Sequence, residues 1–219
     1  MFIGHFAVAF AAKPAAPSVS LGTLFFACEW VDLVWPLFLL IGLERVEIRP
    51  GITAFTPLDF LYYPWTHSLL MGVFWAVAFG LLYLSVRKSG KLALLVGTVV
   101  LSHWFLDLVA HRPDLPLVPG GEARWGFGLW SSIPATLLVE VSLFVAGVSL
   151  YVWRTRAMDR VGRWGLSVLL VFLALAYLGA AFGPPPPNVE AIAWAGLIGG
   201  AATGFLGYWI DRHRAMVMV

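Results

Sequence analysis

The sequence predicts an all-α membrane protein, a polytopic bundle of about six transmembrane helices plus a short N-terminal half-helix. Of its 219 residues, 60% are hydrophobic and only 12% are charged, whereas roughly 25% are charged in ordinary soluble domains. A soluble domain of this length cannot bury so much apolar surface, but a lipid bilayer requires it. The formal net charge of +2 is small, so we expect the lipid bilayer as a partner and no nucleic acid.

Six segments are long and apolar enough to cross a hydrocarbon core of roughly 30 Å at about 1.5 Å per residue. Residues 2–12 form a further apolar stretch, which is too short for a full crossing and is expected to be the half-helix. We expect a single integral membrane domain over residues 1–219. The six predicted spans cover residues 20–43, 56–86, 91–111, 129–153, 164–183 and 189–210.

The basic residues are distributed unevenly over the two sides of this predicted bundle. Ten Lys and Arg residues fall in the connections on one side, and four fall on the other. Because cytoplasmic loops of membrane proteins carry an excess of Lys and Arg, the sequence predicts that both termini are cytoplasmic.

The last predicted span contains a stripe of small residues on one helix face, formed by Gly196, Gly200 and Gly204. Such a stripe allows another helix to approach closely. Two interpretations remain open. The stripe packs against another helix of the same chain, which is the more common use, or it forms a homodimer interface.

Ionisable side chains inside the predicted spans are the strongest functional signal, because each costs roughly 2.5–3.5 kcal/mol on insertion scales. Counted from the outer ends of their spans, Asp32, His67 and Glu140 each lie about 16 Å deep, and His103 lies about 12 Å deep. The sequence therefore predicts one polar layer in the outer half of the membrane. The six residues are Glu29, Asp32, His67, His103, Asp107 and Glu140.

The spacing within this layer favours metal or proton chemistry. Glu29 and Asp32 are three residues apart, and His103 and Asp107 are four apart, so each pair shares a helix face. A histidine and a carboxylate one turn apart can hold one divalent metal ion. The alternative is that these residues pair only to tie helices together. Several such groups at one depth favour the chemical role.

Four short motifs occur in the order typical of a known family. They are Gly4-His5, EWVDLVW with Asp32, PWTHSLL with His67, and LSHWFLDLVAH with His103 and Asp107. This set resembles the bacterial membrane-bound metal-dependent hydrolases, a family distantly similar to zinc-dependent phospholipase C and zinc nucleases. The resemblance covers roughly residues 1–130, and residues 131–219 are then supporting helices.

The resemblance implies a divalent metal ion, zinc above all, and a location in the bacterial cytoplasmic membrane. The chain departs from the family pattern directly after Asp32, where Leu33, Val34 and Trp35 replace further polar groups. The metal ligands that the resemblance implies are His5, Asp32, His67, His103 and Asp107.

We therefore expect a membrane-embedded hydrolase that acts from the outer face on an ester or phosphoester, such as a lipid headgroup. Glu140 or Glu29 is the expected general base, and Arg112 and Arg124 are expected to bind the substrate's charge. One alternative is a small ion- or proton-coupled permease, although the sequence shows no internal repeat of the kind common in transporters. The other is a structural membrane protein with a vestigial metal site.

Overall fold

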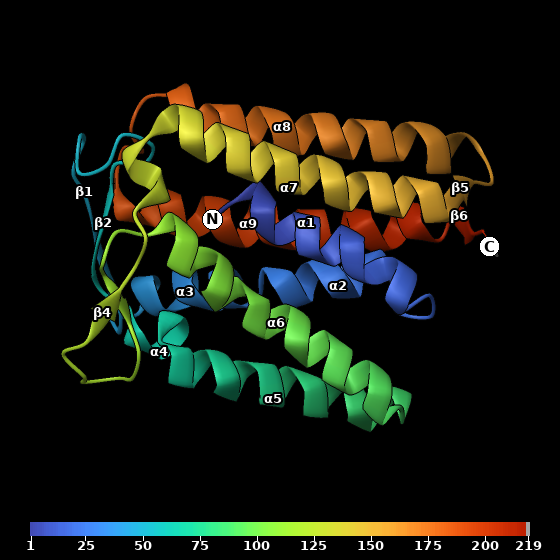
Figure 1. Cartoon of the computed structure of the whole chain (residues 1–219), viewed down its shortest axis with the longest axis horizontal. Coiled ribbons are helices and arrows are strands. Elements are labelled where there is room, and N and C mark those ends of the chain that lie inside the picture. The colour runs from blue at the N-terminus through green and yellow to red at the C-terminus, as the bar shows by residue number, and fades with distance from the viewer. Residues whose placement is uncertain (218–219) are drawn as a thin grey trace.

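The helices run along a roughly common direction, with short two-stranded sheets at both ends of the bundle (Figure 1). A computed structural model of the chain describes residues 1–217. Its helices are α1 (Ile3–Ala12), α2 (Leu21–Cys28), α3 (Trp30–Leu40), α4 (Pro64–His67), α5 (Leu69–Arg87), α6 (Gly90–Ala110), α7 (Ile133–Arg154), α8 (Leu166–Phe182) and α9 (Val189–Asp211).

Three antiparallel strand pairs close the ends of the bundle. At one end, which we call the hairpin end, β1 (Arg45–Ile48) pairs with β2 (Leu58–Tyr62), and β3 (Leu115–Pro116) pairs with β4 (Arg124–Trp125). At the other end, β5 (Thr155–Ala157) pairs with β6 (Arg214–Met216) beside the C-terminus (Figure 1).

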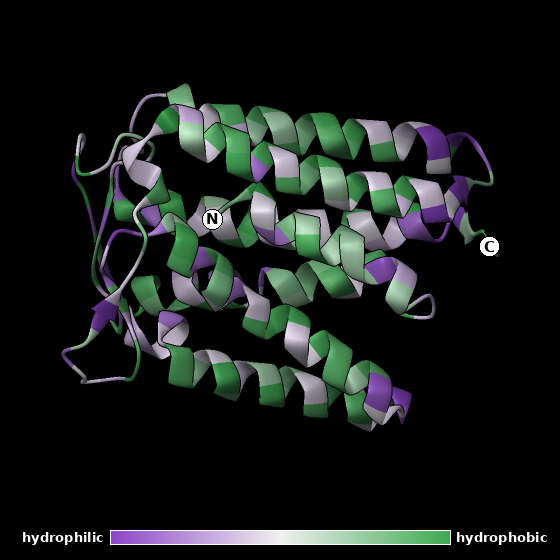
Figure 2. Cartoon of the chain, viewed as in Figure 1, coloured by the Kyte–Doolittle hydropathy of each residue, from purple (hydrophilic) through white to green (hydrophobic). Residues whose placement is uncertain are grey.

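The all-α membrane fold predicted from the composition is confirmed. Five helices are long and apolar enough to cross a membrane, or six if the bent pair α2 and α3 is counted as one span. Large apolar side chains cover the outside of these helices, for example Leu81, Val168 and Ile198, each at least 60% exposed. Polar residues gather mainly at the two ends of the bundle (Figure 2). Lipid stabilises such a surface, whereas water does not.

The first predicted span, residues 20–43, is not one straight helix. Ser20 caps α2 by accepting a hydrogen bond from the amide of Thr23. The chain then bends by 51° at Glu29, and α3 begins at Trp30. Glu29 therefore lies at the break and not inside a helix that it shares with Asp32, although both side chains line the same cavity.

The second predicted span, residues 56–86, begins later than expected. The chain first forms β2 and the short helix α4, which starts with Pro64. Ser68 has an extended backbone and caps α5 by accepting a hydrogen bond from the amide of Met71. His67 therefore precedes the long helix instead of lying 11 residues inside it. The depth of about 16 Å expected for His67 is therefore wrong.

The glycine stripe on α9 faces α2 and α3 of the same chain. A Cβ atom added at Gly200 would lie 2.6 Å from Leu33 of α3. One added at Gly204 would lie 2.5 Å from the ring of Phe26 in α2. Of the two interpretations of the stripe, packing within the chain is the one that the structure shows, and Gly196 faces Pro36 in the same way.

The half-helix α1 lies inside the bundle, packed against α2, α6 and α7. Its residues Phe6 and Phe10 are buried, and both rings meet the ring of Phe25 edge-on. Met1 is buried as well, and its amine contacts Asp107 of α6. The start of α1 thus lies in the interior, away from the end that holds β6 (Figure 1).

Candidate metal centre

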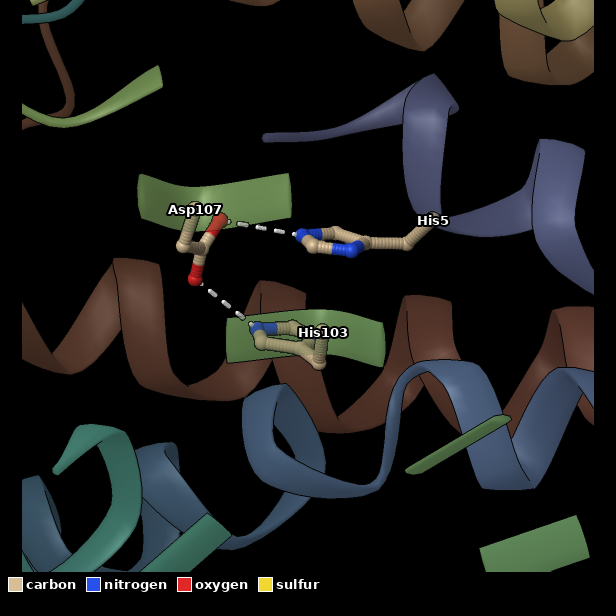
Figure 3. Close-up of side chains that lie close together, drawn as sticks. All are labelled: His5, His103 and Asp107. Atoms are coloured by element: carbon tan, nitrogen blue, oxygen red, sulfur yellow. Dashed lines mark hydrogen bonds and ion pairs between the residues drawn. The ribbon is translucent and has the colours of Figure 1, made fainter. Parts of the chain in front are cut away.

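Two buried histidines, one from α1 and one from α6, contact the same buried carboxylate of α6. One oxygen of Asp107, Oδ1, lies 3.2 Å from Nε2 of His5, and the other, Oδ2, lies 3.1 Å from Nε2 of His103 (Figure 3). All three residues are about 1% exposed. His103 and Asp107, one helical turn apart on α6, share a helix face, as the sequence predicted, and this face meets α1.

A second group of ligand atoms adjoins the first and shares His103 with it. Oδ1 of Asp32 in α3 lies 3.2 Å from Nε2 of His67 in α4 and 3.6 Å from Nε2 of His103. Nε2 of His67 also lies 3.8 Å from Oδ2 of Asp107. The five side chains proposed as ligands from the sequence therefore converge, although they come from four different helices.

The outer nitrogen of His103 is held by the bend between α2 and α3. Its Nδ1 lies 2.8 Å from the carbonyl oxygen of Cys28, the last residue of α2. A carbonyl oxygen only accepts, so Nδ1 must carry the proton. In the neutral ring, Nε2 is then unprotonated, and its lone pair faces Asp32 and Asp107.

Like His103, His67 is held through its Nδ1, in this case by the side chains of Thr66 and Glu44. The hydroxyl of Thr66 lies 2.7 Å from Oε2 of Glu44 and 2.7 Å from Nδ1 of His67. Its single proton goes to the Glu44 carboxylate, so Nδ1 of His67 donates to the hydroxyl oxygen. Glu44 also accepts the backbone amides of Trp65 and Thr66. Burial raises the pKa of Glu44, and His67 and these donors oppose the rise.

A fourth histidine, which the sequence reasoning did not place in the site, stands beside it. His111 follows α6, and its Nε2 lies 4.0 Å from Oδ2 of Asp107. Its Nδ1 lies 2.9 Å from Oδ1 of Asp114. Burial alone would raise the pKa of Asp114, but hydrogen bonds from His111, Tyr63 and Arg112 outweigh it and lower that pKa. The i, i+3 spacing of His111 and Asp114 is the feature of the sequence that could have indicated this pair.

The two glutamates expected as general bases occupy different positions. One oxygen of Glu140, Oε2, accepts the backbone amides of Phe2 at 2.8 Å and Gly4 at 3.3 Å. Glu140 therefore holds the start of α1, the helix that carries His5. Glu29 faces the cavity described below, and the thiol of Cys28 lies 3.9 Å from its Oε1. Only Glu29 is thus placed to act on a molecule in that cavity.

The two arginines expected to bind substrate lie outside this cavity. Arg112 pairs with Asp59 and, at 3.0 Å, with Asp114. The guanidinium of Arg124 donates to the carbonyl oxygens of Gly121 and Ala123 in the exposed loop at the hairpin end. The expectation that these side chains meet the substrate's charge at the metal centre is not met.

The candidate ligand atoms lie beside a cavity of about 370 Å³. Asp32, His67, Asp107 and His111 form its polar end, together with Glu29. Asp32 is the most accessible of the ligand set, with its side chain 35% exposed. The volume is within the usual range for small-molecule sites, roughly 300–1,000 Å³.

The donor atoms fit a divalent metal ion of the zinc type. Four ligands at about 2.0–2.1 Å in a tetrahedron lie roughly 3.3 Å from one another, and the separations above run from 3.1 to 3.6 Å for the closest pairs. Within residues 1–217, the buried Nε2 of His103 has no hydrogen-bond partner of good geometry. Each histidine proton that can be assigned points outward, an arrangement common around metal-binding histidines.

Comparison with protein-family models, with curated proteins and with solved structures finds no match for this chain.

Proposed function

We propose that the chain is a membrane-embedded hydrolase that uses two divalent metal ions, zinc above all, to cleave an ester or phosphoester. The observation that carries this proposal is the arrangement of His67 and His103. Each ring turns a lone pair toward carboxylate oxygens that also carry lone pairs, with its own proton assigned to the outer nitrogen. Such groups repel one another unless a cation lies between them, either a metal ion or a second proton on the imidazole.

Two overlapping sets of donors support two ions. One set is His5, His103 and Asp107, and the other is Asp32, His67 and His103. Within each set the donor atoms lie within 4.8 Å of one another. His111 is the further ligand that we add, because its outer nitrogen is held by Asp114 in the same manner.

Each residue has a distinct role in the proposed reaction. A zinc-type ion held by these residues would supply Lewis acidity, which would polarise the scissile group and activate water near neutral pH. Glu29, at the cavity wall, takes the proton of the attacking water and returns it to the leaving oxygen. Glu44 and Thr66 hold His67 in place, and Glu140 holds α1 and with it His5.

The basic residues support an orientation in a bacterial cytoplasmic membrane. The end that holds β5 and β6 carries Arg154, Arg156 and Arg214, and we place this end and the C-terminus in the cytoplasm. The metal centre then opens toward the outer half of the membrane. A reporter that is active only outside the cytoplasm, fused to the C-terminus, should be silent, and activity would contradict this orientation.

Metal analysis of the detergent-purified protein tests the proposed function. We expect two divalent ions per chain and chelator-sensitive cleavage of a chromogenic phosphodiester or ester. Metal-free protein that drives a proton or solute flux in liposomes would support the permease instead. Metal-free protein with neither activity would support a structural role.

A further inference from the structure

The cavity beside the metal centre has two chemically different ends. Its polar end is the ligand cluster described above. The remaining wall is mainly apolar and comes from α1, α3, the hairpin end, α8 and α9. Buried members of this wall are Phe6, Phe55, Trp130 and Leu173.

Small residues form part of the wall that α8 and α9 contribute. Ala176 and Ala180 of α8 and Ala195, Gly196 and Gly199 of α9 line the cavity, beside the larger Phe172, Leu173 and Ile192. The small residues have no long side chain to fill the space between the two helices. At Gly199 the space is open, because an added Cβ atom would meet no atom of the described chain within 4 Å.

This wall also reaches the outside of the bundle. Ala180, Ala195 and Gly196 line the cavity and are exposed at the same time, and Phe172 is 44% exposed. Both α8 and α9 belong to segments that are apolar and long enough to cross a membrane. An opening between two such helices faces the hydrocarbon of the bilayer.

We infer that the cavity receives a membrane lipid sideways, through the opening between α8 and α9. The hydrocarbon chain of the lipid lies against the small residues of the two helices, and its ester or phosphoester lies at the ligand cluster. A molecule that fills both ends is expected to be amphiphilic, because one end offers charged groups and the other offers mainly apolar contacts. The position of the head group rests on the proposed function, whereas the position of the chain rests on the cavity alone.

Two glycines make a matched pair for the test. Gly199→Leu places a side chain in the cavity. Gly179→Leu makes the same substitution on the exposed face of α8, outside the cavity lining, where an added Cβ atom also meets no atom of the described chain within 4 Å. Ala180→Phe, at the opening, is a second variant in case Gly199→Leu does not fold.

The probe is a phosphatidylglycerol with a photoreactive diazirine at the end of one acyl chain, in vesicles of phosphatidylglycerol and phosphatidylethanolamine. After illumination, adducts are mapped by mass spectrometry to Phe6, Phe55 and Trp130, which are buried and beyond the reach of lipid on the outer surface. We expect adducts at these residues in the wild type and in Gly179→Leu. In Gly199→Leu and Ala180→Phe we expect their loss, with labelling of the outer helix faces retained.

Wild-type protein labelled only on its outer faces would overturn the inference. So would undiminished adducts at the buried residues in folded Gly199→Leu and Ala180→Phe. Metal content measured on the same preparations separates this result from the proposed function. Adducts in metal-free wild-type protein would support the lipid path and reject the metal-dependent hydrolase. Two bound ions without adducts at the buried residues would reject the lipid path and leave the proposed metal centre in place.

Discussion

The imidazole rings of His5 and His103 stack face to face, with centroids 3.7 Å apart and planes 3° from parallel. The stack joins α1 to α6 and directs both Nε2 atoms to the same carboxylate, that of Asp107. Unlike His5, His103 also faces Asp32, with its Nε2 3.6 Å from Oδ1 of that carboxylate. It is therefore the one histidine common to the two donor sets.

This difference predicts unequal metal losses. His103→Ala removes a ligand from both sets, so we expect both ions to be lost. His5→Ala removes a ligand from one set only, and we expect one ion to remain. Elemental analysis of the purified variants measures this, with His213→Ala, in the turn before β6 at the opposite end, as a control that keeps both ions. Equal losses in the two site variants would contradict two overlapping metal sites.

The contact of Thr66 with His67 predicts a loss of affinity without loss of a ligand. Thr66→Val keeps the shape of the side chain but removes the acceptor of the His67 Nδ1 proton. Loss of such outer contacts typically costs about 10- to 100-fold in metal affinity, and we expect this range in competition with a fluorescent zinc indicator. Thr66→Ser should restore the affinity.

Thr136→Val is the matched control for that experiment. Thr136 is as fully buried as Thr66, but its hydroxyl donates to the backbone carbonyl oxygens of Leu129 and Ser132 in η2 (Leu129–Ser131) and at the start of α7. Metal affinity should be unchanged in this variant. A similar loss in both variants would assign the effect to general destabilisation.

The sequence predicted the membrane bundle because apolar runs of about 20 residues are required by the bilayer itself. It also predicted the convergence of His103 and Asp107, because their spacing follows from helix geometry alone. The bend at Glu29 and the extended Ser68 were missed, since hydropathy does not report a break inside an apolar segment. Glu44 was missed because its role depends on a contact with Thr66 between separate elements.

The positions of the two glutamates predict opposite effects on catalysis. Glu29→Gln should keep both ions and abolish hydrolysis, because Glu29 lines the cavity and the amide cannot accept the proton of water. Glu140→Gln should retain hydrolysis, because its side-chain oxygen still accepts the amides of Phe2 and Gly4. Initial rates at saturating zinc measure both. Loss of hydrolysis in Glu140→Gln alone would transfer the role of general base to Glu140.

The close contact between α2 and α9 predicts which glycines the fold requires. A Cβ atom added at Gly22 would lie 2.6 Å from the backbone nitrogen of Tyr208 and would also meet the carbonyl of Gly204. Backbone atoms of a helix cannot move aside as a flexible side chain does, so Gly22→Ala should force α2 and α9 apart. Overpacking of this kind typically costs about 1–3 kcal/mol, and we expect a lower unfolding temperature in detergent.

Gly179→Ala is the control for this prediction, because an added Cβ atom there meets open space within the described chain. Its unfolding temperature should match that of the wild type. If Gly22→Ala also unfolds like the wild type, α2 and α9 do not pack as closely as the glycines indicate. The stripe of Gly196, Gly200 and Gly204 would then be available for the homodimer, and cross-linking through a cysteine placed at Gly200 would detect it.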